Sequence, residues 1–260
     1  MSAIERVAVI TGGAQGIGRR SAELLAQRGC AIAIIDLHQP GDAVRAIQLY
    51  GGVAKGWTGD ITEEATVERF AQGVLDVYGR ADVLVNNAGI SLISPAEHTS
   101  VASYRRVLDV NLVAPFLLAR AFGKRMLEAR SGSIINVASV AGLLGIADRA
   151  AYNASKHGLI GLTRTLAAEW AGRGVRVNAV CPGWVKTEMD AADQARGTYT
   201  DADITERVPM ARFATPDDVA RAIAFLADDR ESSFINGQAL AVDGGWSADG
   251  SWQSLRLSKR

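Results

Sequence analysis

The sequence predicts an α/β protein in which about seven parallel strands form a doubly wound sheet with helices on both faces. Three observations support this fold class: apolar, strand-like runs alternate regularly with helical patterns, a glycine-rich turn joins the first such run to the first helix, and candidate ligand-binding residues follow several strand ends. Regular alternation of strands and helices indicates βαβ units and therefore a parallel sheet. In such sheets a ligand binds outside the carboxyl ends of the strands, near the point where the strand order reverses.

The expected elements follow one another without a linker that would divide the chain. Strands are predicted near residues 6–10, 31–36, 53–58, 82–86, 133–138, 176–181 and 238–242, and helices near residues 17–28, 40–50, 63–79, 101–129, 152–171 and 216–227. Because 260 residues can bury one sizeable core, we expect one catalytic domain over residues 1–245 and a C-terminal extension over residues 246–260.

Composition argues against several classes of function. The 28 basic and 28 acidic residues give zero net charge, which offers no general attraction to nucleic acid or to an anionic membrane. No apolar run approaches the length that spans a bilayer, and no signal peptide precedes the first strand, so we expect a cytoplasmic protein. Cys30 and Cys181 are expected to be free, buried thiols, and the three scattered histidines give no reason to expect a metal.

A glycine-rich turn follows the first predicted strand. Residues 11–18 read Thr-Gly-Gly-Ala-Gln-Gly-Ile-Gly and lead into a helical pattern. Gly12, Gly16 and Gly18 let the backbone turn tightly and approach a pyrophosphate, which the amides and the positive end of the following helix attract. The turn alone is also compatible with a purely structural role.

Asp36 ends the next predicted strand, eighteen residues after the last glycine of the turn. A carboxylate here can accept hydrogen bonds from the adenosine ribose hydroxyls of a dinucleotide. Its charge would repel a 2′-phosphate, and neither Leu37 nor residues 13–15 bring a compensating cation, so NAD is favoured over NADP. Arg19 and Arg20 could reach back to a phosphate, although a solvated helix face is the favoured interpretation of this pair.

Tyr152, Lys156 and Ser139 form a candidate proton-transfer device. Residues four apart share one face of a helix, so the Lys156 ammonium should lie beside the Tyr152 phenol. To act as a base near neutral pH, a phenol has to titrate roughly three pH units below its ordinary pKa of about 10. The ammonium together with a cationic nicotinamide ring could supply the necessary stabilisation, and Ser139 could hydrogen-bond a substrate oxygen. Taken alone, the spacing also fits a buried tyrosine, a surface lysine and a loop serine.

Together these motifs resemble the short-chain dehydrogenase/reductase family in its compact, single-domain form, over about residues 4–245. The resemblance rests on the turn at residues 11–18, the Asn-Asn-Ala-Gly segment at residues 86–89, Asn111, Ser139, Tyr152, Lys156 and the Pro-Gly turn at residues 182–183. It implies a Rossmann-type sheet. It further implies that the cofactor contacts Gly12, Gln15, Gly16, Ile17, Gly18, Asp36, Leu37, Asp60, Ile61, Asn87, Ala88, Gly89, Tyr152, Lys156, Pro182, Gly183, Val185 and Thr187.

The resemblance also implies an activity, the NAD-dependent interconversion of a secondary alcohol and a ketone by hydride transfer. Tyr152 would exchange the alcohol proton and Ser139 would hold the oxygen. Lys156 would hold the nicotinamide ribose hydroxyls and lower the phenol pKa. The fourth catalytic residue, Asn111, would support a water path from Lys156 to solvent.

The substrate pocket is expected to be covered by the segment that follows the Pro-Gly turn and to be edged by the loop before Tyr152. The candidate substrate contacts are Ser139, Tyr152, Trp184 and Arg149. Arg149 could receive an anionic group, although a surface Arg149 paired with Asp148 is favoured. The polar residues 188–199 are expected to form mostly a solvated face. A small polyol, sugar or hydroxy acid is the leading substrate class, because the covering segment lacks the long apolar stripe that a steroid would need.

Two alternatives stay open. A 3-oxoacyl-[acyl-carrier-protein] reductase has nearly the same motifs but generally uses NADPH, and a patch at Lys124, Arg125 and Arg130 could dock an acidic carrier; Asp36 opposes this reading. A non-catalytic NAD-sensing or scaffold protein belongs to another class, and the intact serine, tyrosine and lysine set opposes it.

The C-terminal extension contains Trp246 and Trp252, whose large apolar rings are not expected in a tail that makes no packing contacts. We hypothesise that they pack on a neighbouring subunit, because the resemblance implies a homotetramer formed through long helices and the C-terminal strand region.

Overall fold

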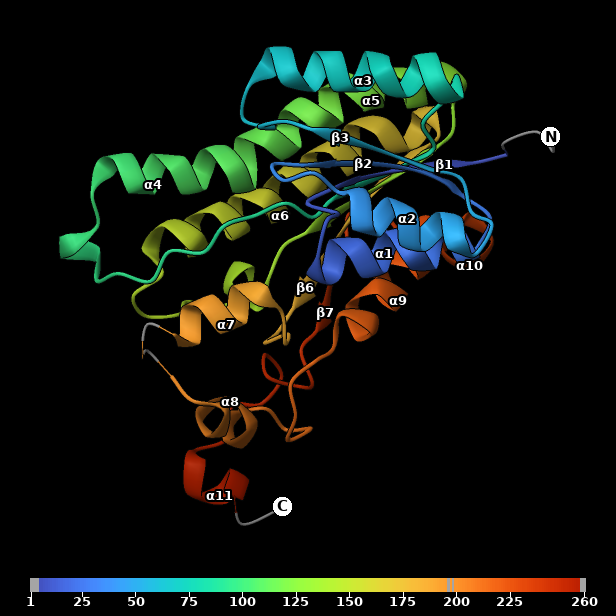
Figure 1. Ribbon diagram of the computed structural model, residues 1–260. Coiled ribbons are helices and arrows are strands. Elements are labelled where there is room, and N and C mark those ends of the chain that lie inside the picture. The colour runs from blue at the N-terminus through green and yellow to red at the C-terminus, as the bar shows by residue number, and fades with distance from the viewer. Residues whose placement is uncertain (1–4, 196, 198, 258–260) are drawn as a thin grey trace.

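A seven-stranded parallel sheet with the order β3-β2-β1-β4-β5-β6-β7 forms the centre of the molecule (Figure 1). The computed structural model describes residues 5–195, 197 and 199–257. The strands are β1 (Val7–Thr11), β2 (Ala31–Asp36), β3 (Ala54–Thr58), β4 (Val83–Asn86), β5 (Gly132–Val137), β6 (Val175–Pro182) and β7 (Ala239–Val242). The predicted fold class is confirmed, and each strand boundary lies within one residue of its prediction.

The strands are apolar on both sides because both faces of the sheet are covered. Along β1, Val7 and Val9 face one hydrophobic core, while Ala8 and Ile10 face the other. All four residues are fully buried. A parallel sheet covered on both faces therefore produces the continuous apolar runs from which the strands were predicted.

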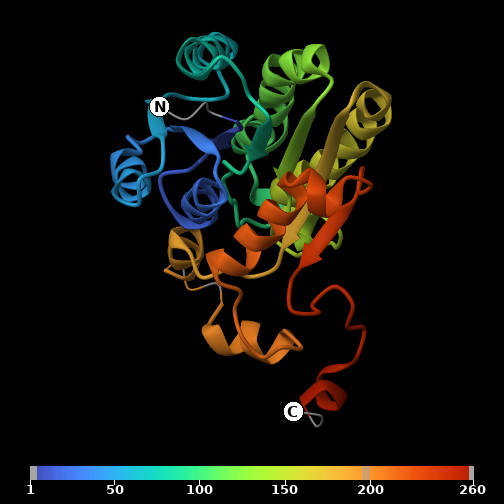
Figure 2. The ribbon, with the colours of Figure 1, turned by 90° about the vertical axis from the view of Figure 1, so that its right-hand side faces the viewer.

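Helices cover the two faces in separate layers (Figure 2). One layer contains α3 (Glu64–Tyr78), α5 (Ala114–Ala129) and α6 (Ala150–Trp170); the other contains α1 (Gly16–Gln27), α2 (Gly41–Leu49) and α9 (Pro216–Ala227). The remaining helices are α4 (Val101–Leu108), α7 (Glu188–Gln194), α8 (Asp201–Arg207), α10 (Asp229–Ser232) and α11 (Gln253–Leu257), with short 3-10 turns at Ala96–His98, Val140–Gly142 and Ala171–Arg173.

The single helix predicted over residues 101–129 is interrupted. Between α4 and α5, residues Asp109–Val113 form a π-helical turn that contains Asn111. The flanking residues keep helical backbone angles, so the axis continues and the interruption is local. Apolar periodicity cannot reveal one wider turn, which is why the sequence predicted an unbroken helix.

The reversal of strand order between β1 and β4 positions the candidate site. The carboxyl ends of β1, β2, β4, β5 and β6 all face the same edge of the sheet, because the sheet is parallel throughout. Figure 1 shows α7, α8 and α11 beyond that edge, away from the helical layers. Among the described residues, no helix is long and apolar enough to cross a membrane. Cys30 and Cys181 are free and buried, as predicted.

Phe122 is the basis for a stability prediction. It is fully buried on α5, and its ring meets that of Phe70 edge-to-face with centroids 5.7 Å apart. Phe122→Ala should lower the free energy of unfolding by about 3–5 kcal/mol, measured by urea denaturation, because it removes a core side chain and leaves a cavity. The matched substitution Phe234→Ala, at a fully exposed ring, should change it by less than about 0.5 kcal/mol. Similar losses in both variants would contradict this account of the core.

Candidate active site

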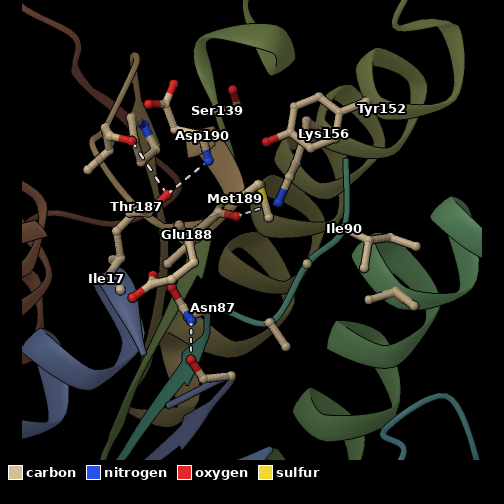
Figure 3. A pocket seen from close by; sticks show the side chains of 18 of the residues that line it. Ile17, Asn87, Ile90, Ser139, Tyr152, Lys156, Thr187, Glu188, Met189 and Asp190 are labelled. Carbon is tan, nitrogen blue, oxygen red and sulfur yellow. Dashed lines mark hydrogen bonds between the residues drawn. The ribbon is translucent and has the colours of Figure 1, made fainter. Parts of the chain in front are cut away.

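A cavity of about 440 Å³ lies at the carboxyl edge of the sheet (Figure 3). Most residues predicted to bind cofactor or substrate line it, namely Gly12, Gln15, Gly16, Ile17, Asp36, Leu37, Asp60, Ile61, Asn87, Ala88, Gly89, Ser139, Arg149, Tyr152, Lys156, Pro182, Gly183, Trp184, Val185 and Thr187. Gly18 and Asn111 are not on its wall. They lie behind it and support residues that are.

The glycine turn depends on close backbone contacts. A Cβ atom on Gly18 would lie 2.1 Å from the Gly12 carbonyl oxygen, and Gly12 itself adopts a positive φ of 64°. The Asn87 side-chain amide donates hydrogen bonds to the carbonyl oxygens of Thr11 at 3.0 Å and Gly12 at 2.9 Å. Gly18 therefore serves the turn through its lack of a side chain, and Asn87 holds the turn against the end of β4.

The first turn of α1 lies at the cavity wall, which Gln15, Gly16 and Ile17 line. The N-cap residue of α1, Gln15, forms no side-chain hydrogen bond with the backbone amides of this turn, and Gly16 begins the helix at a φ of 55°. Unpaired amides at the positive end of a helix attract an anion such as a pyrophosphate. The glycine cradle and these amides fit a dinucleotide cofactor.

Asp36 is held at the end of β2 by two backbone hydrogen bonds. Its Oδ2 accepts from the amide of Ala14 and its Oδ1 from the amide of His38, each at 3.0 Å. The carboxylate keeps further lone pairs for ribose hydroxyls. Arg19 pairs with Glu23 on α1 at 3.0 Å, and Arg20 pairs with Asp217 on α9 at 2.7 Å, so both arginines have partners other than Asp36.

Asp60 carries the second acidic group on the nucleotide side of the cavity. It accepts hydrogen bonds from the Thr62 amide at 2.9 Å and hydroxyl at 2.7 Å, and from the Arg106 guanidinium at 3.0 Å. Burial acts to raise the pKa of Asp60, but these hydrogen bonds together hold it below its ordinary value. Arg106 lines the cavity and was not predicted, because its link to Asp60 spans 46 residues.

Ser139, Tyr152 and Lys156 come together across the β5–α6 region, as Figure 3 shows. Ser139 follows β5, and its side chain acts to lower the pKa of the nearby Tyr152 phenol. Lys156 lies one turn further along α6, with its Nζ 5.6 Å from the centroid of the Tyr152 ring. That Nζ donates a hydrogen bond to the carbonyl oxygen of Val137 at 2.8 Å.

Burial dominates the electrostatics of this set. It raises the pKa of the Tyr152 phenol, although the hydrogen bond with Ser139 and the charge of Arg149 oppose the change. Burial also lowers the pKa of Lys156 to about 8. Desolvation thus penalises the charged form of each group, and the expected lowering of the phenol pKa by Lys156 and a nicotinamide charge stays a prediction.

Asn111 ties three segments together from the π-helical turn. Its Oδ1 accepts from the Ile90 amide at 2.9 Å, and its Nδ2 donates to the Ile90 carbonyl at 3.0 Å and to the Ser155 hydroxyl at 3.1 Å. Asn111 is fully buried. Its geometry fixes the loop after β4 against α6, next to Lys156. The water path expected from the family resemblance stays a prediction.

The substrate side of the cavity differs from one expectation. Arg149 does not form a surface pair with Asp148; its side chain is 11% exposed and pairs with Asp193 on α7 at 3.4 Å. Most described residues of the segment 188–199 are exposed, as predicted, but Asp190 and Asp193 are buried and line the cavity. The contact between Arg149 and Asp193 joins residues 44 positions apart, so it leaves no local signal in the sequence.

The C-terminal extension contacts the cavity wall of its own chain. Trp246 stacks on Trp184 with ring centroids 4.1 Å apart and an interplanar angle of 25°. The Arg207 guanidinium, from α8, lies 4.6 Å from the Trp246 ring centroid. The Trp246 ring thus packs within the chain, and the expected contact of this residue with a neighbouring subunit stays a prediction. Trp252 is 69% exposed, and a subunit contact there stays a prediction.

The fold and the site together define a dinucleotide-dependent oxidoreductase, and comparison with known proteins gives its family. A family model described as enoyl-(acyl carrier protein) reductase matches residues 12–247. D-threitol dehydrogenase of Mycolicibacterium smegmatis is 43% identical over 93% of this chain and 92% of its own length. A 3-oxoacyl-[acyl-carrier-protein] reductase of Synechocystis is 39% identical over 92% of this chain and 96% of its own.

Among solved structures, a proposed NAD(P)-dependent gluconate 5-dehydrogenase from Beutenbergia cavernae, with bound NADP at low occupancy, matches with a TM-score of 0.87. It is 44% identical and covers 94% of this chain and 98% of its own. The chain belongs to the short-chain dehydrogenase/reductase family, whose members use a nicotinamide cofactor. Within the described part of the chain, no group of three or more side chains is arranged to hold a metal ion.

The Trp184–Trp246 stack leads to a prediction. Trp246→Ala should raise the KM for the alcohol about two- to tenfold, because Trp184 loses the ring that fixes it against the cavity and an aromatic pair contributes about 0.5–1.5 kcal/mol. The dissociation constant of NADH, measured by fluorescence, should stay within about twofold, as the stack lies on the substrate side. The matched variant Trp252→Ala should leave both constants unchanged, and equal effects in the two variants would refute a specific role for the stack.

Proposed function

We propose that the protein is an NAD-dependent dehydrogenase that interconverts a secondary alcohol and a ketone, with a small, polar substrate such as a polyol, sugar or hydroxy acid. The observation that carries the proposal is the convergence of Ser139, Tyr152 and Lys156 on one cavity with the glycine turn and Asp36. A proton-transfer group and a dinucleotide cradle in one cavity are what alcohol oxidation by hydride transfer requires.

The chain's residues would act as follows in the oxidative direction. Tyr152 removes the proton of the alcohol hydroxyl, and the Ser139 hydroxyl holds the same oxygen in place. Lys156 has three donors, of which one is bound to Val137, so others are available for the ribose hydroxyls. When bound, the oxidised nicotinamide supplies the hydride acceptor and a positive charge near the phenol. The buried Tyr152 becomes an effective base only when that charge opposes the desolvation that raises its pKa.

The choice of NAD rests on Asp36. Its carboxylate is fixed at the end of β2 by the amides of Ala14 and His38. A 2′-phosphate would have to approach this negative charge, whereas ribose hydroxyls would donate to it. The ion pairs of Arg19 and Arg20 with Glu23 and Asp217 support the same choice, since these cations already have partners.

A second candidate function, a 3-oxoacyl-[acyl-carrier-protein] reductase using NADPH, is favoured by the similarity to the Synechocystis reductase. Its expected docking patch is weakened by the pairing of Arg125 with Glu128 at 3.0 Å. Reduction of an acetoacetyl thioester by NADPH distinguishes this candidate. A non-catalytic NAD-sensing protein would have no need of a buried phenol beside Ser139. The homotetramer and the cytoplasmic location expected from the sequence stay predictions.

The function can be tested at Tyr152. Tyr152→Phe should reduce kcat for alcohol oxidation by about 10²–10⁴-fold, because it removes the proton acceptor. NADH binding, followed by fluorescence, should change less than about twofold. The matched variant Tyr50→Phe, at a residue that is 82% exposed, should keep wild-type kcat. Substantial turnover by Tyr152→Phe would exclude the tyrosine from its proposed role.

Cofactor choice and substrate class can be tested by initial rates of NADH or NADPH formation against polyols, sugars, hydroxy acids and hydrophobic secondary alcohols. We expect kcat/KM to be at least about tenfold higher with NAD than with NADP, and Asp36→Asn to narrow that ratio because it removes the repelling charge. If no alcohol is oxidised with NAD but an acetoacetyl thioester is reduced by NADPH, the protein is instead a 3-oxoacyl-[acyl-carrier-protein] reductase.

A further inference from the structure

The α7 helix brings two buried carboxylates to the substrate side of the cavity. Asp190 is 7% exposed and Asp193 is 6% exposed, and both line the cavity. Asp190 accepts a hydrogen bond from the Tyr199 hydroxyl at 2.8 Å and pairs with Lys186 at 3.3 Å. Asp193 faces the loops that edge the catalytic tyrosine, so the two acids have different surroundings.

Asp193 forms a compact polar unit with Arg149 and Ser91. Its Oδ2 lies 3.4 Å from the Arg149 guanidinium and accepts a hydrogen bond from the Ser91 hydroxyl at 3.0 Å. Arg149 Nη1 in turn donates to the same hydroxyl at 2.8 Å. The side chains of the ion pair are 11% and 9% exposed. A buried pair of this kind is costly to separate, because each charge would be left without its partner.

The unit lies next to the reacting group. The Arg149 guanidinium is 6.0 Å from the centroid of the Tyr152 ring. Arg149 and Asp193 also change the pKa of the Tyr152 phenol in opposite directions, which places both charges within electrostatic reach of it. A substrate whose carbinol oxygen sits at Ser139 and Tyr152 would therefore place its adjoining carbon substituents near this pair.

The charge balance favours a neutral partner. An anionic substituent would need the Arg149 cation, but that cation is already paired with Asp193, and α7 adds the buried carboxylate of Asp190 to the cavity wall. Binding the anion through Arg149 would bring it close to a buried carboxylate. A hydroxyl can instead donate to Asp193 and accept from Arg149 without separating them.

We propose that this cavity selects neutral, polyhydroxylated alcohols over hydroxy acids, and that the Asp193–Arg149 pair determines this specificity by binding a hydroxyl adjoining the carbinol. The proposal rests on the proposed dehydrogenase function and narrows its substrate class. In the reaction the carbinol C–H and O–H bonds break and a C=O bond forms. The hydride reduces NAD⁺ to NADH, the proton passes to Tyr152 and then to solvent, and the adjoining hydroxyl is unchanged.

The test compares neutral tetritols and pentitols with aldonic acids of the same carbon number, by kcat/KM with saturating NAD. The wild-type protein should favour the best polyol by about tenfold or more. Asp193→Asn should lower kcat/KM for that polyol by about tenfold or more, the loss expected for one charge-assisted hydrogen bond. The same variant should narrow or reverse the polyol-to-aldonate ratio, because it frees the Arg149 cation, while the NADH dissociation constant stays within about twofold.

Asp201→Asn is the matched control. Asp201 also forms an ion pair, with Lys186 at 2.5 Å, but its side chain is 61% exposed and it does not line the cavity. This variant makes the same change of charge and should keep the wild-type substrate ratio. An equal change of the polyol-to-aldonate ratio in both variants would overturn the assignment to Asp193, because it would mean that the net charge of this region alone sets the ratio.

The remaining outcomes separate the inference from the function on which it rests. A wild-type preference for aldonates, or an unchanged ratio in a folded Asp193→Asn protein, would overturn the inference and leave the dehydrogenase function intact. Failure of every alcohol, with NADH still bound, would instead refute the proposed function. The wild-type comparison needs no variant, so it tests the substrate class even if Asp193→Asn does not fold.

Discussion

The hydrogen bonds of Asn87 and Thr11 join the two halves of the sheet at the point where the strand order reverses. The Asn87 amide donates to the carbonyl oxygens of Thr11 and Gly12, and the Thr11 hydroxyl accepts from the backbone amides of Asn87 at 3.1 Å and Ala88 at 3.0 Å. These contacts fix the end of β4 against the glycine turn. The cofactor cradle and the loop that leads to Asn111 and Lys156 therefore keep one relative position.

Burial is the second constraint, and it acts on the chemistry. Tyr152 and Lys156 sit where desolvation disfavours both phenolate and ammonium. The same burial that gives precise positions therefore opposes the charge state that alcohol oxidation needs. Within the proposed mechanism, the positive charge that an oxidised cofactor supplies would favour the phenolate form of Tyr152 against this desolvation.

On the substrate side, α7 contributes the buried acids Asp190 and Asp193 to the cavity wall. Trp184, which also lines the cavity, stacks on Trp246 from the C-terminal extension. Arg207 on α8 also contacts the Trp246 ring, so the C-terminal extension links α8 to the cavity wall at Trp184. The extension thus contributes to the shape of the pocket within its own chain, whatever it also does at Trp252.

The sequence by itself determined the sheet, the glycine turn, Asp36 and the Ser139–Tyr152–Lys156 set, because each is written in local periodicity or in short, ordered motifs. It did not reveal the π-helical turn at Asn111, since a single wider turn barely changes apolar periodicity. Only the tertiary structure decided that Arg149 pairs with Asp193, that the α7 acids Asp190 and Asp193 are buried, and that Trp246 stacks on Trp184. The physical reason is that these contacts join residues far apart in the chain, and side-chain packing between such residues depends on how the helices and loops finally meet.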